Sequence, residues 1–216
     1  MRHLAVLALF FIGCSSGSDA TGPDAGAGPD GGPVGAQCPI AASTADLGAM
    51  AATKANMCNE PQTMGRMHWY KLATAMPGGT DVIELGLWDG LGAFKNGTAH
   101  IGTFTIAGED AVFSTCGVCV RAVGDKGASG SKEYFATGGT VNVTAMGTDG
   151  QQLAATLSNL TMVEVDPTTH KPVASGCAAT VAGAQVSGTI VQLGGGGGGT
   201  GGGGGGGGGC SQVIGD

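Results

Sequence analysis

A run of strand-forming residues with two cysteines in its middle most constrains the fold. Residues 112–123 read VFSTCGVCVRAV, so residues that favour β-strands flank Cys116 and Cys119 on both sides. Residues three apart on an extended strand lie about 10 Å apart and point to opposite faces, whereas a disulfide needs Cα atoms within about 7 Å. Either residues 117–118 make a turn or bulge that closes a local loop, or the two cysteines bond different partners.

The use of these thiols has three interpretations. A thioredoxin-type redox centre needs its first cysteine at a helix N-terminus, which strand-forming flanks do not provide. A structural zinc site needs a second close pair, and Cys58 and Cys177 are isolated in the sequence. Structural disulfides are therefore expected. We predict separate partners for Cys116 and Cys119, with Cys177 and one of Cys38 or Cys58 as their mates.

Short strand patterns recur along the chain at 8–12-residue spacing and predict an all-β fold. Residues 81–88 alternate, with Ile83, Leu85 and Leu87 on one face and Glu84 on the other. Residues 41–57 fit either a short helical turn or a first strand at 44–50. Further strands are expected at residues 64–74, 100–107, 112–123, 133–137, 140–146, 153–157, 160–165, 177–181 and 184–193. We predict an antiparallel β-sandwich or barrel-like domain of about eight to ten short strands.

The first residues have the layout of a secretory signal. Arg2 precedes the apolar residues 4–13, a run shorter than the roughly 20 residues that span a bilayer. Residues 11–14, FIGC, resemble the bacterial lipobox, although Phe11 stands where an aliphatic residue is usual. The resemblance implies a signal peptide at residues 1–13 and diacylation of Cys14, which would make a lipid bilayer the partner of the mature chain. The alternative is an ordinary signal peptide cut nearby, with Cys14 incidental.

The composition shifts along the chain predict the domain organisation. Residues 14–37 are rich in Gly, Pro, Asp and Ser and cannot offset their ordering entropy, so we expect a disordered linker. The domain is expected at residues 38–193. Residues 194–209 are glycine except Thr200, and the tail 194–216 is expected to be a flexible coil whose Cys210 reaches most faces of the domain. Ser15 follows the cysteine that is expected to be lipidated, and in this the chain resembles lipoproteins that are passed on to an outer membrane. The resemblance predicts that the protein is located at the outer membrane.

Charge and cysteine number restrict the partners. The chain has 9 Lys and Arg against 16 Asp and Glu, and loss of Arg2 with the signal would leave a net charge of −8. No basic patch is present, so nucleic acids and anionic lipid headgroups are poor partners. With Cys14 acylated, an even number of cysteines remains, which predicts three disulfides in an oxidising compartment. The candidates are Cys38, Cys58, Cys116, Cys119, Cys177 and Cys210.

Aromatic side chains are the other candidate site. Trp69, Tyr70 and Trp88 would form a binding face for an envelope protein or a glycan if exposed, but filling of the core is the favoured interpretation. A small-ligand carrier would instead have a cavity lined by Trp69, Trp88 or Phe104. No catalytic motif, metal-ligand spacing or cofactor fingerprint is present, so we predict no enzyme activity, no metal and no cofactor.

Several stretches between residues 81 and 177 carry a family resemblance. In order they are LWDGLGAF, GTFTIAG, STCGVCV, YFATGGTVNVT, LSNLTMVEV and SGC. This part of the chain resembles an uncharacterised bacterial lipoprotein family with an all-β domain carrying a C-x-x-C motif. The resemblance implies a β domain at the cell envelope and no catalytic residues. The expected role is a non-enzymatic structural or binding module, and the alternative is an envelope thiol redox or metal-binding protein using Cys116 and Cys119.

Overall fold

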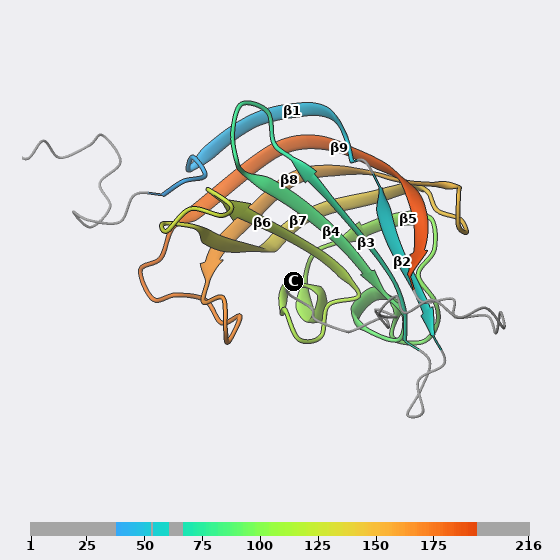
Figure 1. The fold of residues 1–216 in the computed structure, drawn as a ribbon. Helices are drawn as coiled ribbons and strands as arrows, with labels where there is room; N and C mark the ends of the chain where they lie inside the picture. Colours follow the sequence, from blue (N-terminus) through green and yellow to red (C-terminus); the bar gives the residue numbers. More distant parts are fainter. Residues whose placement is uncertain (1–37, 53, 61–66, 194–216) are drawn as a thin grey trace, which may run out of the picture. The chain divides into compact units, whose positions relative to one another are not determined.

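The computed structural model describes residues 38–52, 54–60 and 67–193, which form one nine-stranded sheet (Figure 1). The prediction of an all-β domain is confirmed, and two short 3-10 helices accompany the strands in the described residues. The elements are β1 (Ser43–Ala51), β2 (Ala55–Glu60), β3 (Met67–Ala75), β4 (Val82–Trp88), η1 (Gly92–Phe94), β5 (Gly102–Thr105), η2 (Gly108–Ala111), β6 (Val118–Gly124), β7 (Lys132–Ala145), β8 (Gln152–Val165) and β9 (Ala178–Leu193).

The sheet closes on itself and is barrel-like. Hydrogen-bonded pairs run in a circuit from β9 through β2, β3, β4, β6, β7 and β8 back to β9. β6 pairs with residues 132–135 of β7, and β5 pairs with residues 140–143 of the same strand. β5 and β6 therefore lie one after the other along one edge of β7. Closure pairs the strand edges that an open sheet would leave unpaired.

The sheet is mixed: most of its pairings are antiparallel, as predicted, and two are parallel, which the sequence pattern did not predict. β1 pairs with Thr180–Ser187 of β9 and β2 pairs with Ile190–Leu193, and both pairings are parallel. The two strands therefore lie one after the other along the same edge of β9, as Figure 1 shows. Of the two interpretations of residues 41–57, the strand is the correct one.

Three strands are longer than the sequence pattern predicts. Residues 133–137 and 140–146 belong to the single strand β7, and β8 and β9 each join two predicted strands in the same way. The register between β7 and β8 shifts at Gly138, where Gly139 has φ +120° and Asn159 has φ +50°. Gly-Gly and Ser-Asn resemble turn signals, but here they form bulges inside continuous strands.

The core fills the inside of the closed sheet. Alternation in β4 directs Ile83, Leu85 and Leu87 inward, as predicted, and each is at most 1 % exposed. Other strands contribute mainly aliphatic side chains, and Tyr134 of β7 is the largest of the fully buried ones.

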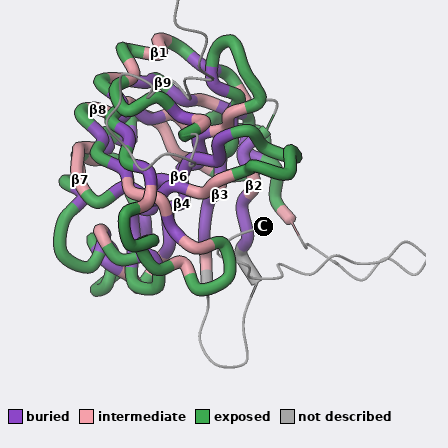
Figure 2. Tube along the Cα trace, turned by 90° about the vertical axis from the view of Figure 1, so that its left-hand side faces the viewer, coloured by how far each residue is buried: buried purple, intermediate pink, exposed green. Residues whose placement is uncertain are grey.

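β4 and β6 are buried on both faces. Every residue of β6 is buried, and all of β4 except Val82 is buried, as the purple stretches of these strands in Figure 2 show. A half-exposed strand would alternate between buried and exposed residues. Something therefore covers the outside of the sheet at these two strands.

Other predictions fall outside the described residues. They concern the signal peptide at residues 1–13, Cys14, the linker to residue 37, the tail from residue 194 and Cys210. Within the ranges that the structure describes, no helix has the length and apolar character needed to cross a membrane.

Candidate functional site

The connection between β4 and β6 supplies part of this cover through Leu91, Phe113 and Cys116. It comprises η1, β5, η2 and residues 112–117, and its end carries the C-x-x-C motif. The prediction of one strand over residues 112–123 is wrong for its first half, because β6 begins only at Val118. The preceding residues turn instead, and the amide of Cys116 donates to the carbonyl of Val112 at 3.0 Å.

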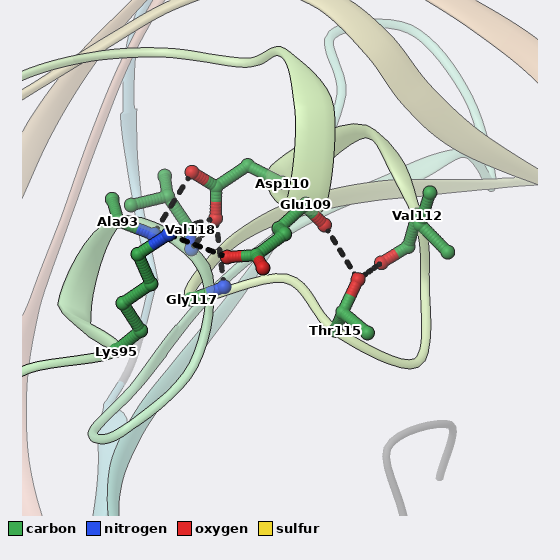
Figure 3. A network of polar contacts seen from close by, with 8 residues as sticks. All are labelled: Ala93, Lys95, Glu109, Asp110, Val112, Thr115, Gly117 and Val118. Carbon is green, nitrogen blue, oxygen red and sulfur yellow. Dashed lines mark hydrogen bonds and ion pairs between the residues drawn. The ribbon is translucent and has the colours of Figure 1, made fainter.

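The carboxylate of Asp110 holds this connection together (Figure 3). Its Oδ1 accepts hydrogen bonds from the amides of Gly117 (2.7 Å) and Val118 (3.0 Å). Both of its oxygens lie within 3.2 Å of the amide of Ala93 in η1. Asp110 is only 6 % exposed, and its contacts satisfy backbone donors that burial would otherwise leave costly. Residues far apart in the connection thus converge on one side chain.

Two glycines allow this close approach. A Cβ on Gly92 would overlap Oδ1 of Asp110, and a Cβ on Gly117 would overlap the carbonyl oxygen of Leu91. Gly92 also has φ +42°, in the left-handed region that favours glycine. The backbone at η1 and the backbone before β6 therefore lie closer together than they could if Gly92 or Gly117 carried a side chain.

Cys116 and Cys119 form a disulfide with each other, with their Cα atoms 5.4 Å apart. The prediction of separate partners is therefore wrong, and the alternative of a local loop is correct. The physical reason is the Asp110 contact, which bends the backbone at Gly117 and so brings the two Cα atoms within bonding range. Both cysteines are buried, with exposures of 1 % and 5 %.

The disulfide belongs to a second apolar cluster on the outside of the sheet, which we call the outer cluster. Its buried members are Cys58, Trp69, Trp88, Phe113, Cys116, Cys119, Phe135 and Val165. They come from β2, β3, β4, β6, β7 and β8 and from the connection before β6. This cluster accounts for the burial of Trp88 on β4 and of Cys119 on β6.

The three aromatic candidates separate onto two faces. Trp69 and Trp88 are cross-strand neighbours in the outer cluster, with ring centroids 5.4 Å apart. Tyr70 lies in the main core, and its hydroxyl donates to the carbonyl of Gly147 at 3.0 Å. All three residues are buried, so they do not form an exposed binding face; filling of apolar clusters, the favoured interpretation, fits their positions.

The remaining described cysteines are also oxidised. Cys38 and Cys177 form a disulfide with Cα atoms 5.7 Å apart and 139 residues apart in the sequence. Glu164 supports it, since one carboxylate oxygen accepts from the amide of Cys177 at 2.8 Å and from Lys132 Nζ at 3.0 Å. Cys58, on β2, is disulfide-bonded as well.

A charged group lies beside the outer cluster on β4, β6 and β7. Arg121 is 3.8 Å from Glu84 through Nε and 3.6 Å from Glu133 through Nη2. Its guanidinium carbon is 5.9 Å from the centroid of the Phe113 ring, which stacks on His170. Arg121 and Glu84 are 7 % and 5 % exposed. Because water solvates neither charge well at this position, each charge is stabilised by the opposite charge beside it.

An open depression of about 960 Å³ lies between η1 and η2, lined in part by Phe94, Asn96, His100 and Glu109. Lys95 and Glu109 form an exposed ion pair of 3.5 Å at its side. Neither tryptophan lines it, and Phe104 packs edge-on against Phe94 instead. The carrier interpretation, which needs these aromatic residues around one cavity, therefore has no support from this depression.

The site lacks the arrangement of a thiol redox enzyme of the thioredoxin type. Cys116 precedes a strand, so no helix dipole acts on its sulfur. Within the described residues, no three His, Cys, Asp or Glu side chains are grouped to hold a metal ion. The Cys116–Cys119 disulfide closes a short covalent loop that packs in the outer cluster with Trp69 and Trp88.

Comparison with known proteins adds no relative. No family model matches the chain, and no curated protein or solved structure is significantly similar to it. The site therefore has to be interpreted from its own geometry.

Sequence reasoning missed Asp110 and Arg121, and it placed Glu84 on the outer face of its strand without identifying a partner. The signal for the charged group was present, because a single Glu or Arg at the centre of an apolar strand pattern has to find a partner. Asp110 follows glycine and glutamate in what resembles an ordinary polar turn. Only the fold shows that its carboxylate faces three backbone amides.

Proposed function

We propose that the chain is a lipid-anchored structural or binding module of the cell envelope, tied to the membrane through Cys14. The observation that carries the proposal is the oxidised state of the described cysteines, which bond as Cys38–Cys177 and Cys116–Cys119. Disulfides persist in oxidising compartments outside the cytosol, and the signal-like residues 1–13 and the lipobox-like FIGC supply a route there.

The position of the Cys38–Cys177 disulfide supports a structural role in holding the domain to the linker. Cys38 is the first described residue of the domain and follows directly on the expected linker. Its bond to Cys177 joins the start of the domain to the residue before β9, which pairs with β1, β2 and β8. A pull applied through the linker would reach three strand pairings at once and not only β1.

The buried polar groups also support a structural role. The carboxylate of Asp110 is engaged with three backbone amides, and Arg121 is held between two carboxylates. Buried groups with such partners stabilise a fold and are not poised for chemistry on a substrate. A binding role would use the open depression between η1 and η2, whose lining combines Phe94 with polar groups such as Asn96.

Labelling with palmitate in a bacterial host tests the anchor. We expect label on the full chain, membrane association after cell fractionation, and loss of both in Cys14→Ser. Ser16→Ala is the matched control, since it changes a nearby residue without touching the acylation site or a disulfide. Absence of label on the unmodified chain, with the protein in the cytosolic fraction, would overturn the proposal.

A second candidate function is envelope thiol redox exchange through Cys116 and Cys119, favoured by the disulfide inside a C-x-x-C motif. Equilibration with glutathione buffers separates the two. A structural bond stays oxidised in buffers that reduce a catalytic pair, whose potential lies near −120 to roughly −270 mV. Reduction within that range, abolished in Cys116→Ser/Cys119→Ser, would favour the redox function.

A further inference from the structure

The Cys38–Cys177 disulfide is chemically asymmetric, because its two sulfurs lie in different surroundings. Cys38 is exposed at the surface, whereas Cys177 is 6 % exposed. The ammonium of Lys132 donates to Sγ of Cys177 at 3.4 Å. A thiol in solution therefore reaches the sulfur of Cys38 more readily, and the positive charge that would stabilise a departing thiolate lies beside Cys177.

Glu164 holds the Lys132 side chain at this sulfur. Lys132 begins β7, and Glu164 lies near the end of the antiparallel strand β8. Oε2 of Glu164 accepts from Lys132 Nζ at 3.0 Å and from the amide of Cys177 at 2.8 Å. The side chains of Lys132 and Glu164 are 20 % and 14 % exposed, so salt and water screen their charges only weakly. One carboxylate thus brings the ammonium and the backbone of Cys177 together.

Contacts other than the disulfide anchor the backbone near both cysteines. Ile40 is 1 % exposed and belongs to the main core. The carbonyl of Ala42 accepts from the amide of Thr180 at 3.0 Å and from its hydroxyl at 3.1 Å. Because these contacts lie close in sequence to the two cysteines, the sulfurs should stay near each other after the bond opens. The opened bond can therefore form again.

We propose that the Cys38–Cys177 bond is a site of thiol–disulfide exchange, at which small monothiols form a mixed disulfide with Cys38 and Cys177 is the leaving group. The attacking thiolate forms a bond with Sγ of Cys38, the old S–S bond breaks, and its electron pair goes to Sγ of Cys177. One disulfide is consumed and one is formed, so no further oxidant or reductant takes part. The ammonium of Lys132 stabilises the departing thiolate. Attack by Cys177 on the mixed disulfide reverses the reaction.

Reaction of the full, oxidised chain with 2-mercaptoethanol, an uncharged monothiol, tests the direction of exchange. N-ethylmaleimide stops the reaction and blocks the free thiols, and the peptides are then mapped by mass. Trypsin separates the two cysteines, because it cuts after Lys54 and Lys126. We expect mercaptoethanol on Cys38 and maleimide on Cys177. Mercaptoethanol on Cys177, or none on Cys38, would overturn the proposal.

Two substitutions in the charged pair separate stabilisation of the leaving group from a merely structural role. Lys132→Met keeps the length of the side chain without its charge, and it should slow formation of the mixed disulfide by roughly three- to tenfold. Glu164→Gln keeps an acceptor for the amide of Cys177 and removes the charge that offsets the ammonium, so it should speed the reaction. If the pair only braced the bond, both substitutions would loosen it and speed its exchange. Exchange in Lys132→Met as fast as in the unmodified chain, or faster, would overturn the proposal.

Lys126→Met is the matched control, since Lys126 is a half-exposed lysine whose ion pair is with Glu84. It should exchange at the rate of the unmodified chain, and equal slowing in Lys126→Met and Lys132→Met would overturn the role of Lys132. The reaction takes place on purified protein in solution, so it goes beyond the membrane anchor and does not depend on it. A chain without an acyl group on Cys14 should show the same exchange, so the two proposals can fail separately.

Discussion

Oδ1 of Asp110 accepts a 2.7 Å hydrogen bond from the amide of Gly117, the residue between Cys116 and the start of β6. This contact fixes the backbone at the point where the C-x-x-C loop turns into the sheet. A charge-assisted hydrogen bond of this length is about twice as strong as a neutral one. The local disulfide and the strand β6 are therefore held by a carboxylate from another part of the connection.

Replacement of this carboxylate should loosen the loop. Asp110→Ala leaves the amides of Ala93, Gly117 and Val118 without their acceptor. We expect a loss of about 2–4 kcal/mol in the free energy of unfolding, measured by urea denaturation, and faster reduction of the Cys116–Cys119 bond by dithiothreitol. Glu109→Ala, at the exposed neighbouring position, should change stability by less than about 0.5 kcal/mol. Equal effects of the two variants would contradict this role for Asp110.

The glycine in the motif should not tolerate a side chain. Gly117→Ala places a Cβ against the carbonyl oxygen of Leu91, and backbone cannot move aside as a flexible side chain can. We expect a lower melting temperature and a loss of roughly 2–4 kcal/mol. Gly97→Ala, in the same connection but with no atom within 4 Å of the new Cβ, is the control. A melting temperature of Gly117→Ala equal to that of the control would show that the two backbone segments lie further apart.

Replacement of the buried Arg121 should lower the free energy of unfolding more than replacement of the exposed Lys126, which also lies near Glu84. Arg121→Ala leaves Glu84 and Glu133 in a poorly solvated position without their shared cation. We expect a loss of about 3–5 kcal/mol in the free energy of unfolding. Lys126→Ala removes a half-exposed cation that also lies 3.8 Å from Glu84, and it should cost less than about 1 kcal/mol. Chemical denaturation of both variants at neutral pH measures the difference.

The tyrosine side chains should ionise at a higher pH in the folded protein than in the unfolded chain. Burial raises the pKa of Tyr134 to about 12, and the carboxylates of Glu164, Asp81 and Asp125 add to this effect. Burial, with Asp89, raises the pKa of Tyr70 as well. Because the fold favours the neutral phenol of Tyr134, the stability that it contributes is present below pH 10 and is lost as the pH rises from 10 towards 12. The loss should be of the order of 2 kcal/mol.

Ultraviolet titration of tyrosinate measures this delay, since the chain has two tyrosines. Native protein should show little ionisation at pH 10, where urea-unfolded protein is half ionised. Tyr134→Phe should remove the later of the two native transitions. Two native transitions centred near pH 10 would contradict the burial of both phenols.

The sequence by itself determined the fold class, the inward alternation of Ile83, Leu85 and Leu87, and the importance of the cysteines. These follow from local periodicity and composition, which each stretch of chain carries within itself. The closure of the sheet, the parallel pairing of β1 and β2 with β9, and the bulges that join predicted strands depend on which distant edges meet.

Tertiary structure alone decided how the cysteines pair. Spacing on an extended strand favoured separate partners for Cys116 and Cys119, and a local bond required a turn at residues 117–118. The chain is not extended there, because Asp110 binds the amides of Gly117 and Val118 and turns the backbone. A contact between a side chain and backbone segments that meet only in the folded chain leaves no periodic trace in the sequence, so only the fold could reveal it.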